Sequence, residues 1–335
     1  MIVVTGGTGT VGRQVVTQLS ERGAPVRAVT RDPAAAGLPE GVEAVRGDLA
    51  DPASLEPHLA GADSVFLVWP FTSPTLAADL GSRAVQVLAR HVPRIVYLSA
   101  QAAAGRPGSF WATIEQLIEE SGAQWTFLRP TGFATNTLMW ADQIRSGAVV
   151  RWPYGAAVRS LIHERDIAAV AVAALTAGGH AGQKYLLTGP ESIAQAEQAR
   201  LIGEAIGRPV YWEELAPEAA REYLLAAWGD PGFADSALAT WAGLVTQPEP
   251  VTRTVEEVTG VPARTFQQWA SDHARDFGPL ATVADAAIVR ADVSYHTPPH
   301  EPGSSAETLA ERPRPRPARR PGSRPRGSAC PVTFI

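Results

Sequence analysis

The sequence predicts an α/β fold built on a doubly wound parallel sheet. Through the first 130 residues, short runs rich in valine alternate with longer stretches of helical periodicity. Strands of this composition are typical of a parallel sheet whose two faces are both covered by helices. A glycine-rich stretch, TGGTGTVGR (5–13), follows the first apolar run and opens the first helical stretch. These observations place ligand-binding loops at the carboxyl ends of the strands.

The expected elements follow in order along the chain. Strands are predicted at residues 2–5, 26–30, 42–47, 64–69, 94–99 and 124–130, and helices at 11–23, 76–91 and 110–121. After Pro130 the alternation loosens. A helix is expected over 164–175, with Asp166 as its N-cap, then a strand at 184–190, a capped helix over 192–209 and a helical region over 217–277. We therefore expect a sheet domain at 1–130 and a smaller mixed α/β substrate-binding subdomain at 131–278, interleaved with it.

Composition changes near residue 278. The 335 residues are 45% hydrophobic and 19% charged, and no apolar stretch reaches membrane-spanning length. Residues 279–335 are rich in Pro and Arg, and RPRPRPARRPGSRPR (312–326) holds seven arginines and no acid, which predicts a disordered basic tail. Removing those seven charges from the formal net charge of −5 leaves −12 on residues 1–311, which argues against nucleic acid as a partner.

The start of the chain and its cysteine usage bear on compartment and chemistry. The first residues lead directly into a predicted strand, so we expect a cytoplasmic protein. The only cysteine, Cys330, lies in the predicted tail, which excludes an internal disulfide and a thiolate metal site. No pattern in the sequence supports metal or membrane binding, and none fixes the oligomeric state.

The glycine stretch has the spacing of a phosphate-binding turn. Gly7, Gly9 and Gly12 fit the pattern G-x-G-x-x-G, and Gly6, Gly9 and Gly12 fit G-x-x-G-x-x-G. Glycines allow a tight turn and a close approach of the backbone to a pyrophosphate, and the unpaired amides and dipole at the helix start favour its charge. Because the pattern lies between a strand and a helix, it predicts a Rossmann-type dinucleotide site.

Charged residues after the second and third strands bear on which dinucleotide binds. Arg31 ends the second strand and Arg13 follows the glycine stretch, and two guanidinium groups favour the 2′-phosphate of NADP(H) over NAD(H). Asp32 keeps open the alternative that an acid holds a free ribose hydroxyl. Asp48 either accepts a hydrogen bond from the adenine amino group or caps the next short helix. The predicted cofactor-binding residues are Gly6, Thr8, Gly9, Thr10, Val11, Gly12, Arg13, Arg31, Asp48, Leu49, Val68, Trp69, Ser99 and Pro130.

Several blocks beyond the glycine stretch resemble the NmrA-like group of atypical short-chain dehydrogenase/reductases. The most specific are TFLRPTGFATN (126–136) and YLLTGPE (185–191), and the likeness extends over residues 1–278. The resemblance implies a Rossmann-type domain, a small carboxyl-terminal substrate domain and an NADP(H) site. Members of the group include NADPH-dependent quinone reductases, reductases of aromatic secondary metabolites and redox-sensing regulators that bind the cofactor without turning it over.

The tyrosine and lysine dyad that donates a proton in the wider superfamily is absent. Lys184 is the only lysine in the chain and stands beside a late strand, while Pro107 and Trp111 fall near the dyad positions. Ser99, which ends the fifth strand, is kept as a backbone or cofactor contact. Tyr97 lies inside that strand and is expected to be buried.

We therefore predict an NADPH-dependent reductase that transfers hydride to a quinone-like, aromatic or conjugated carbonyl small molecule. Such acceptors delocalise the developing negative charge, so water or a weak acid can supply the proton. Aromatic side chains in predicted loops would suit a flat, hydrophobic substrate. The predicted substrate-pocket residues are Phe71, Trp111, Phe133, Trp140 and Trp152. The candidate catalytic residues are His163 and Tyr154, as proton donors, and Asn136, which either orients a carbonyl or caps a helix.

Two other functions remain open at this point. One is a non-catalytic NADP(H)-binding redox sensor or regulator, which the absent dyad favours. The other is a non-redox cyclase or isomerase that retains the cofactor. A sensor would bind the cofactor without turnover, and a cyclase would convert its substrate with no net loss of NADPH absorbance.

Overall fold

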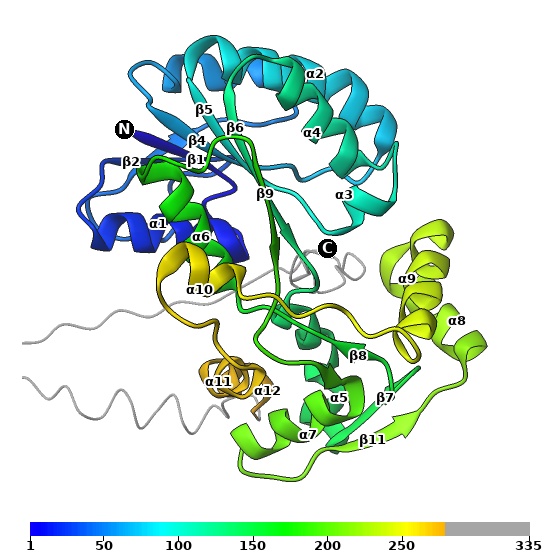
Figure 1. Cartoon of the computed structure of the whole chain (residues 1–335). Helices are drawn as coiled ribbons and strands as arrows, with labels where there is room; N and C mark the ends of the chain where they lie inside the picture. Colours follow the sequence, from blue (N-terminus) through cyan, green and yellow to red (C-terminus); the bar gives the residue numbers. More distant parts are fainter. Residues whose placement is uncertain (279–335) are drawn as a thin grey trace, which may run out of the picture. The chain divides into compact units, whose positions relative to one another are not determined.

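The computed structural model describes residues 1–278, and its central feature is a parallel sheet of seven strands (Figure 1). The strand order is β3-β2-β1-β4-β5-β6-β9, which is the Rossmann order with one further strand at the edge. The strands are β1 (Ile2–Thr5), β2 (Val26–Thr30), β3 (Glu43–Arg46), β4 (Ser64–Val68), β5 (Arg94–Leu98), β6 (Gln124–Pro130) and β9 (Gln183–Leu187). The predicted fold class is confirmed. The predicted tail and Cys330 lie outside the described residues.

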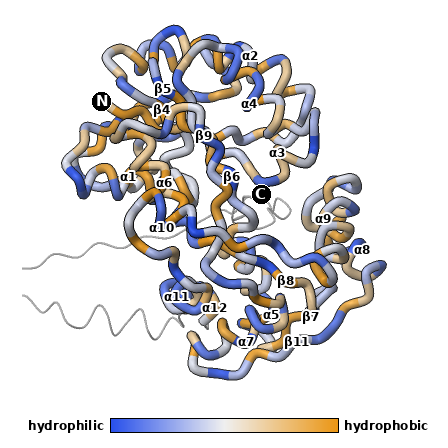
Figure 2. The backbone as a smooth tube through the Cα atoms, viewed as in Figure 1, coloured by the Kyte–Doolittle hydropathy of each residue, from blue (hydrophilic) through white to orange (hydrophobic). Residues whose placement is uncertain are grey.

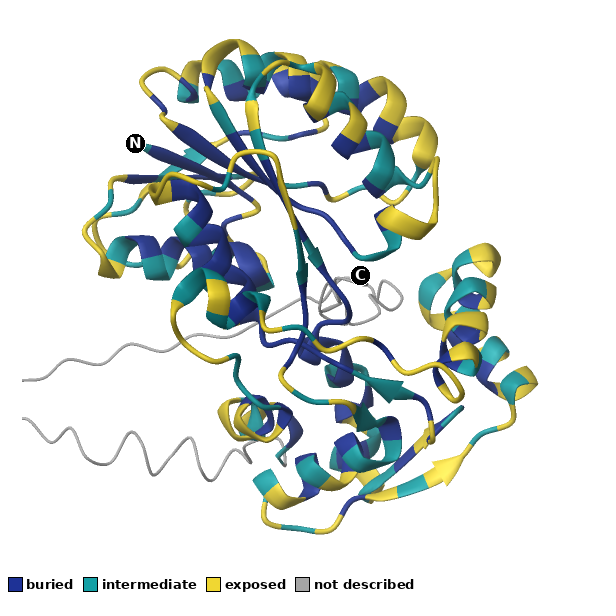
Figure 3. Cartoon of the chain, in the orientation of Figure 1, coloured by how far each residue is buried: buried dark blue, intermediate teal, exposed yellow. Residues whose placement is uncertain are grey.

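Helices cover both faces of this sheet. On one face lie α2 (Pro74–His91), α4 (Phe110–Glu120) and the short 3-10 helix η1 (Pro52–His58); on the other lie α1 (Thr10–Glu21) and α6 (Glu164–Thr176) (Figure 1). Successive residues of β4 point to opposite faces, so Val65 and Leu67 join one apolar cluster and Phe66 joins the other. The central strands β1, β4 and β5 are accordingly hydrophobic and largely buried, whereas the edge strands β3 and β9 are more exposed (Figures 2 and 3).

A smaller mixed part follows β6. It contains a two-stranded parallel sheet of β7 (Val149–Trp152) and β11 (Tyr211–Glu214), and an antiparallel pair of β8 (Val158–Arg159) and β10 (Ile193–Ala194). Its helices are η2 (Ala134–Trp140), α5 (Ala141–Gly147), α7 (Gln195–Ala205), α8 (Pro217–Trp228), α9 (Pro231–Leu244), α11 (Phe266–Asp272) and α12 (Ala274–Phe277).

The chain passes between the two parts several times. After residue 131 it returns to the large sheet as α6 and β9, and again as α10 (Thr254–Thr259), whose Val255 joins the apolar cluster beneath α6. A four-residue helix, α3 (Ala102–Gly105), follows β5. No helix within residues 1–278 is long and apolar enough to cross a membrane.

Two sequence-based expectations about helix starts were wrong. The helix expected over 192–209 begins at Gln195, because the preceding residues pair with β8, and its N-cap Ala194 offers no side-chain bond. The N-cap of α6 is His163, whose side chain accepts from the Arg165 amide, and not Asp166. The Asp166 carboxylate instead accepts hydrogen bonds from the Arg264 amide and guanidinium.

A buried ion pair joins α4 to β6 directly beneath the carboxyl end of β5. Glu115, whose side chain is 5% exposed, accepts from the Arg129 guanidinium at 2.9 and 2.5 Å, and from the Ser99 hydroxyl at 2.5 Å. A buried carboxylate needs such partners, because removal from water disfavours its charge. Burial, with the nearby Glu115 charge, also raises the pKa of Tyr97 well above its usual value.

We expect Glu115→Ala to lower the free energy of unfolding by about 3 kcal/mol, because it leaves the Arg129 charge buried and unpaired. Urea denaturation of the two proteins measures the difference. The matched control is Glu119→Ala on the same helix, which removes a half-exposed pair with Lys184 and should cost less than about 1 kcal/mol. Equal losses in both variants would contradict the structural role given to Glu115.

Candidate cofactor and substrate site

The glycine stretch forms a tight turn between β1 and α1. Gly6 has a φ of +64°, and its carbonyl accepts from the Gly9 amide at 2.9 Å. A Cβ at Gly12 would stand 2.1 Å from the Gly6 carbonyl oxygen, so only glycine allows α1 to approach β1 this closely. Gly9 is the N-cap of α1 and carries no capping side chain, which leaves the first amides of the helix for an anion. This turn fits the pyrophosphate of a dinucleotide.

The loop is open on its outer side and tied to the sheet on its inner side. Gly6, Thr8 and Gly9 are exposed and Thr10 is half-buried, whereas Val11 is buried. The Thr5 hydroxyl donates to the Phe66 carbonyl at 3.2 Å and accepts from the Val68 amide at 2.9 Å. These bonds hold the end of β1 against the end of β4, which places Val68 beside Gly6.

The charged side chains around the end of β2 are one exposed arginine and two side chains bonded to the loop that follows β2. Arg13 donates to the carbonyls of Ala36 and Gly37, at 3.0 and 2.7 Å. The Asp32 carboxylate lies 3.4 Å from the Ala35 amide of its own turn. Arg31 is exposed, and the structure gives its guanidinium no carboxylate partner within residues 1–278. Of the two arginines expected at a 2′-phosphate, Arg31 is therefore the one available.

The remaining predicted cofactor residues surround the same edge of the sheet. The Asp48 carboxylate accepts from the Ala50 amide at 2.9 Å, which shapes the turn before η1, and Leu49 and Trp69 are 7% exposed. Pro130 ends β6 and is buried. The Ser99 hydroxyl donates to Glu115 and its amide to the Leu128 carbonyl, so its side chain contacts the protein interior, and a contact of Ser99 with the cofactor stays a prediction.

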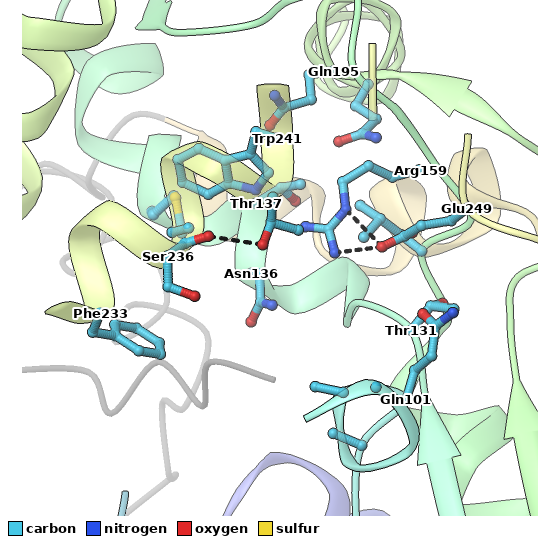
Figure 4. Close-up of a pocket in the computed structure, with 18 of the residues that line it drawn as sticks. Gln101, Thr131, Asn136, Thr137, Arg159, Gln195, Phe233, Ser236, Trp241 and Glu249 are labelled. Atoms are coloured by element: carbon cyan, nitrogen blue, oxygen red, sulfur yellow. Dashed lines mark hydrogen bonds and ion pairs between the residues drawn. The ribbon is translucent and has the colours of Figure 1, made fainter. Parts of the chain in front are cut away.

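A cavity of about 590 Å³ opens beyond the carboxyl ends of β5 and β6 (Figure 4). Its lining begins with Ala100 and Thr131, which follow those strands, and continues into the smaller part of the protein. Three of the predicted pocket aromatics, Trp111, Trp140 and Trp152, line it. Trp241 of α9 joins them, with its ring centroid 5.4 Å from that of Trp152. The cavity therefore has the size and aromatic lining of a small-molecule site.

Asn136 lines the cavity from η2. Its residue is 8% exposed, its Oδ1 is buried, and the structure gives that oxygen no hydrogen-bond partner. The N-cap of η2 is Phe133, and it makes no side-chain capping bond. The alternative that Asn136 caps this helix is thus removed, and its amide remains a group that could orient a substrate.

Two predicted pocket aromatics do not reach the cavity. Phe133 is fully buried and belongs to the core cluster beneath α1 and α6, where its backbone pairs with Ile162. Phe71 lies after β4 and packs edge-on against Trp69, with ring centroids 5.1 Å apart. Both expectations are corrected: an aromatic residue following a strand can turn into the core as readily as toward a ligand.

The two predicted proton donors are also corrected. His163 is 1% exposed; its Nδ1 accepts from the Arg165 amide at 3.2 Å and its Nε2 lies 3.3 Å from the Asp272 carboxylate. Tyr154 sits at a left-handed turn with a φ of +60° and packs on the apolar cluster of the smaller part, outside the cavity lining. His163 therefore fixes α6 to α11, and neither residue is placed to donate a proton in the cavity.

One ion pair in the cavity lining was not predicted from the sequence. Arg159 of β8 donates to the Glu249 carboxylate at 2.9 and 3.3 Å, and the other oxygen of Glu249 accepts from the Ser160 amide at 2.9 Å (Figure 4). Both side chains are largely buried. The partners are ninety residues apart, so no local pattern could have joined them. A Cβ on Gly132 would stand 2.2 Å from the Arg159 guanidinium, so a larger residue there would require this side chain to shift.

The strand order, the glycine turn and the adjoining aromatic cavity define a dinucleotide-binding Rossmann protein with a small-molecule site. Residues 6–177 match a family model described as NAD(P)H-binding. The chain belongs to this NAD(P)H-binding, NmrA-like family of atypical short-chain dehydrogenase/reductases and is an NAD(P)H-dependent oxidoreductase.

Two characterised relatives align over nearly their whole length. A (4-alkanoyl-5-oxo-2,5-dihydrofuran-3-yl)methyl phosphate reductase of Streptomyces griseus is 41% identical, covering 83% of this chain and 100% of that protein. An NAD(P)H azoreductase of Xenophilus azovorans is 38% identical, covering 83% and 99%. Among solved structures, the Escherichia coli NADPH-dependent quinone oxidoreductase in complex with NADPH has a TM-score of 0.69 at 23% identity, covering 81% of this chain and 99% of that one. This last likeness supports the fold.

A second buried charge cluster makes stability depend on pH. Burial raises the pKa of Glu164, but the neighbouring imidazoles of His163 and His273 outweigh it and hold the pKa well below 4.5. Burial lowers the pKa of His273, but Glu164 and Asp276, each at 2.8 Å, outweigh it and raise the pKa above 6.5. Protonated His273 therefore stabilises the fold fully below pH 6.5, and this contribution is lost as pH rises through the raised value. The Glu164 contribution is lost only in acid.

We expect the free energy of unfolding to fall as the pH is raised from about 6 to about 9, and His273→Gln to flatten this dependence. Urea denaturation at several pH values measures it, and His58→Gln on the protein surface is the control. A slope that persists in His273→Gln would contradict the assignment.

Proposed function

We propose that this oxidoreductase uses NADPH to reduce flat, conjugated acceptors, such as quinones, conjugated enones and azo compounds, in the cavity beyond β5 and β6. The observation that carries the proposal is the aromatic lining of the cavity, which also includes the buried side-chain amide of Asn136. When bound, NADPH supplies a hydride, and one solvent proton completes the two-electron reduction. The proposed contact surface for the acceptor is formed by Trp111, Trp140, Trp152 and Trp241.

The ionisable groups of the cavity favour this class of acceptor. Among the described lining residues these groups are Arg106, Arg159 and Glu249. The Glu249 carboxylate accepts hydrogen bonds from Arg159 and from the Ser160 amide, so both of its oxygens are already engaged within the protein. A conjugated acceptor spreads the negative charge that hydride transfer creates, so it needs no strong enzymic acid. An isolated ketone, by contrast, would require one.

The substrates named for the two characterised relatives support the same class. One name contains an oxo-dihydrofuran, a conjugated lactone, and the other an azo bond. In this chain the Nδ2 group of Asn136 would donate a hydrogen bond to an oxygen or nitrogen of the acceptor and orient it, while the indoles would exclude water from the reacting face.

The decisive experiment follows NADPH absorbance with menadione, a conjugated enone and an azo dye. We expect turnover that Gly9→Asp abolishes, because the added carboxylate stands where the pyrophosphate would bind. Asn136→Ala should lower kcat/KM by about a hundredfold. Thr135→Ala, a neighbour in η2 outside the cavity lining, should leave turnover unchanged. NADPH binding without oxidation of any acceptor would overturn the proposal.

We also propose that Arg31 gives the enzyme a preference for NADP(H). Arg31→Ala should raise the KM for NADPH about tenfold and leave that for NADH nearly unchanged, because one charge-assisted contact to the 2′-phosphate is lost. Steady-state kinetics with both cofactors measure the ratio. The control is Arg22→Ala at the far end of α1. Equal changes with NADPH and NADH would contradict this role.

A further inference from the structure

We propose that Arg106, together with Ser236, forms an anion-binding subsite at the mouth of the cavity, so the preferred substrates carry a phosphate, sulfonate or carboxylate group. The inference rests on the proposed function in one respect: the anion belongs to the molecule that is reduced. Arg106 follows α3, on the segment that continues from β5, and Ser236 lies on α9 across the opening.

Charge balance singles out Arg106. The charged side chains that line the cavity within residues 1–278 are those of Arg106, Arg159 and Glu249. Arg159 and Glu249 are paired at 2.9 Å and largely buried, so their charges compensate each other. Arg106 contacts hydroxyl groups and has no carboxylate partner in this part of the chain. The cavity therefore carries one uncompensated positive charge, and it lies at Arg106.

The hydrogen-bond geometry leaves donors for an oxyanion. One terminal nitrogen of Arg106 donates to the Ser236 hydroxyl at 2.8 Å, and the other lies 3.3 Å from the Thr240 hydroxyl. A guanidinium has five N–H donors, so others remain available. The Ser236 hydroxyl accepts from Arg106 and keeps its own proton to donate, whereas the Thr240 hydroxyl donates to the Ser236 carbonyl at 2.8 Å. Arg106 and Ser236 can thus bind one oxyanion between them.

The position of the pair suits an amphipathic substrate. Arg106 and Thr240 are exposed, whereas Asn136, Trp140 and Trp152, which also line the cavity, are buried. A flat acceptor would lie among the indoles and keep its charged group in contact with water at the mouth. This arrangement avoids the cost of burying an anion, and it disfavours the reverse orientation. Arg106 would thereby act on both affinity and orientation.

The test uses a matched pair of probes, anthraquinone-2-sulfonate and anthraquinone-2-sulfonamide, which share the acceptor and differ in charge. Isothermal titration calorimetry measures the binding of each to the enzyme loaded with NADP+. We expect Arg106→Gln to weaken binding of the sulfonate about tenfold and to change binding of the sulfonamide less than about twofold. Raising the salt concentration should weaken sulfonate binding to the unmodified enzyme and have little effect on Arg106→Gln.

Two further variants separate an anion site from a structural latch between α3 and α9. Arg106→Lys keeps the charge and should retain most of the preference for the sulfonate. If Arg106→Gln does not fold, the test is the salt dependence of sulfonate binding to the unmodified enzyme, and sulfonate binding that does not weaken with salt would contradict the subsite. Arg221→Gln removes an arginine that pairs with Asp235 on α9 outside the cavity and should change neither probe. Equal weakening of both probes in Arg106→Gln, or no weakening of either, would overturn the proposal.

The outcome is distinguishable from a failure of the proposed function, because binding is measured without turnover. Charge-selective binding that depends on Arg106, in an enzyme that oxidises no NADPH with any acceptor, would keep the subsite and reject the reductase assignment. Turnover of neutral quinones, without charge-selective binding, would support the reductase assignment and reject the subsite.

Discussion

All strands of the large sheet run in one direction, and this constraint organises the rest of the site. Parallel strands require a crossover after each one, so their carboxyl ends meet at a single edge. At that edge the close approach of Gly12 to the Gly6 carbonyl sets the start of α1, and the loops after β5 and β6 begin the cavity. The loops that would contact the cofactor and the substrate therefore lie next to each other because all strands run in one direction. The sequence of each loop can vary without changing the sheet.

Buried ion pairs hold in place the loops at this edge of the sheet. Glu115 and Arg129 hold the end of β5 through Ser99, and Arg159 with Glu249 holds the segment that crosses from α9 back to α10. Pairs of this kind contribute less to net stability than their removal would suggest, because forming them requires desolvation. Here these ion pairs mainly determine geometry, since each orients a segment that would otherwise be held only by apolar contacts.

The absence of the usual tyrosine and lysine dyad is consistent with the residues that line the cavity. Lys184 lies on the edge strand β9, paired with Glu119 at 2.7 Å, and cannot serve the cavity. Trp111, which stands near a dyad position, lines the cavity with an indole. This cavity offers apolar contact area and excludes water, and among its described lining residues it has no strong acid. Such a cavity suits acceptors that delocalise the negative charge created by hydride transfer. Under the proposed function, Arg106 is the charge that would select among such acceptors.

The sequence by itself determined the strands, the glycine turn and the resemblance to the family, because each depends on local spacing. Period-two and period-3.6 patterns reflect burial of a face, and G-x-G-x-x-G reflects a turn that other residues cannot form. Three tryptophans of the cavity, Trp111, Trp140 and Trp152, were also predicted from the sequence. Tertiary structure alone decided that Phe133 and His163 face the interior, that Arg13 on α1 binds the loop after β2, and that Arg159 meets Glu249. These outcomes depend on side-chain direction and on partners distant in the chain, about which local patterns carry no information.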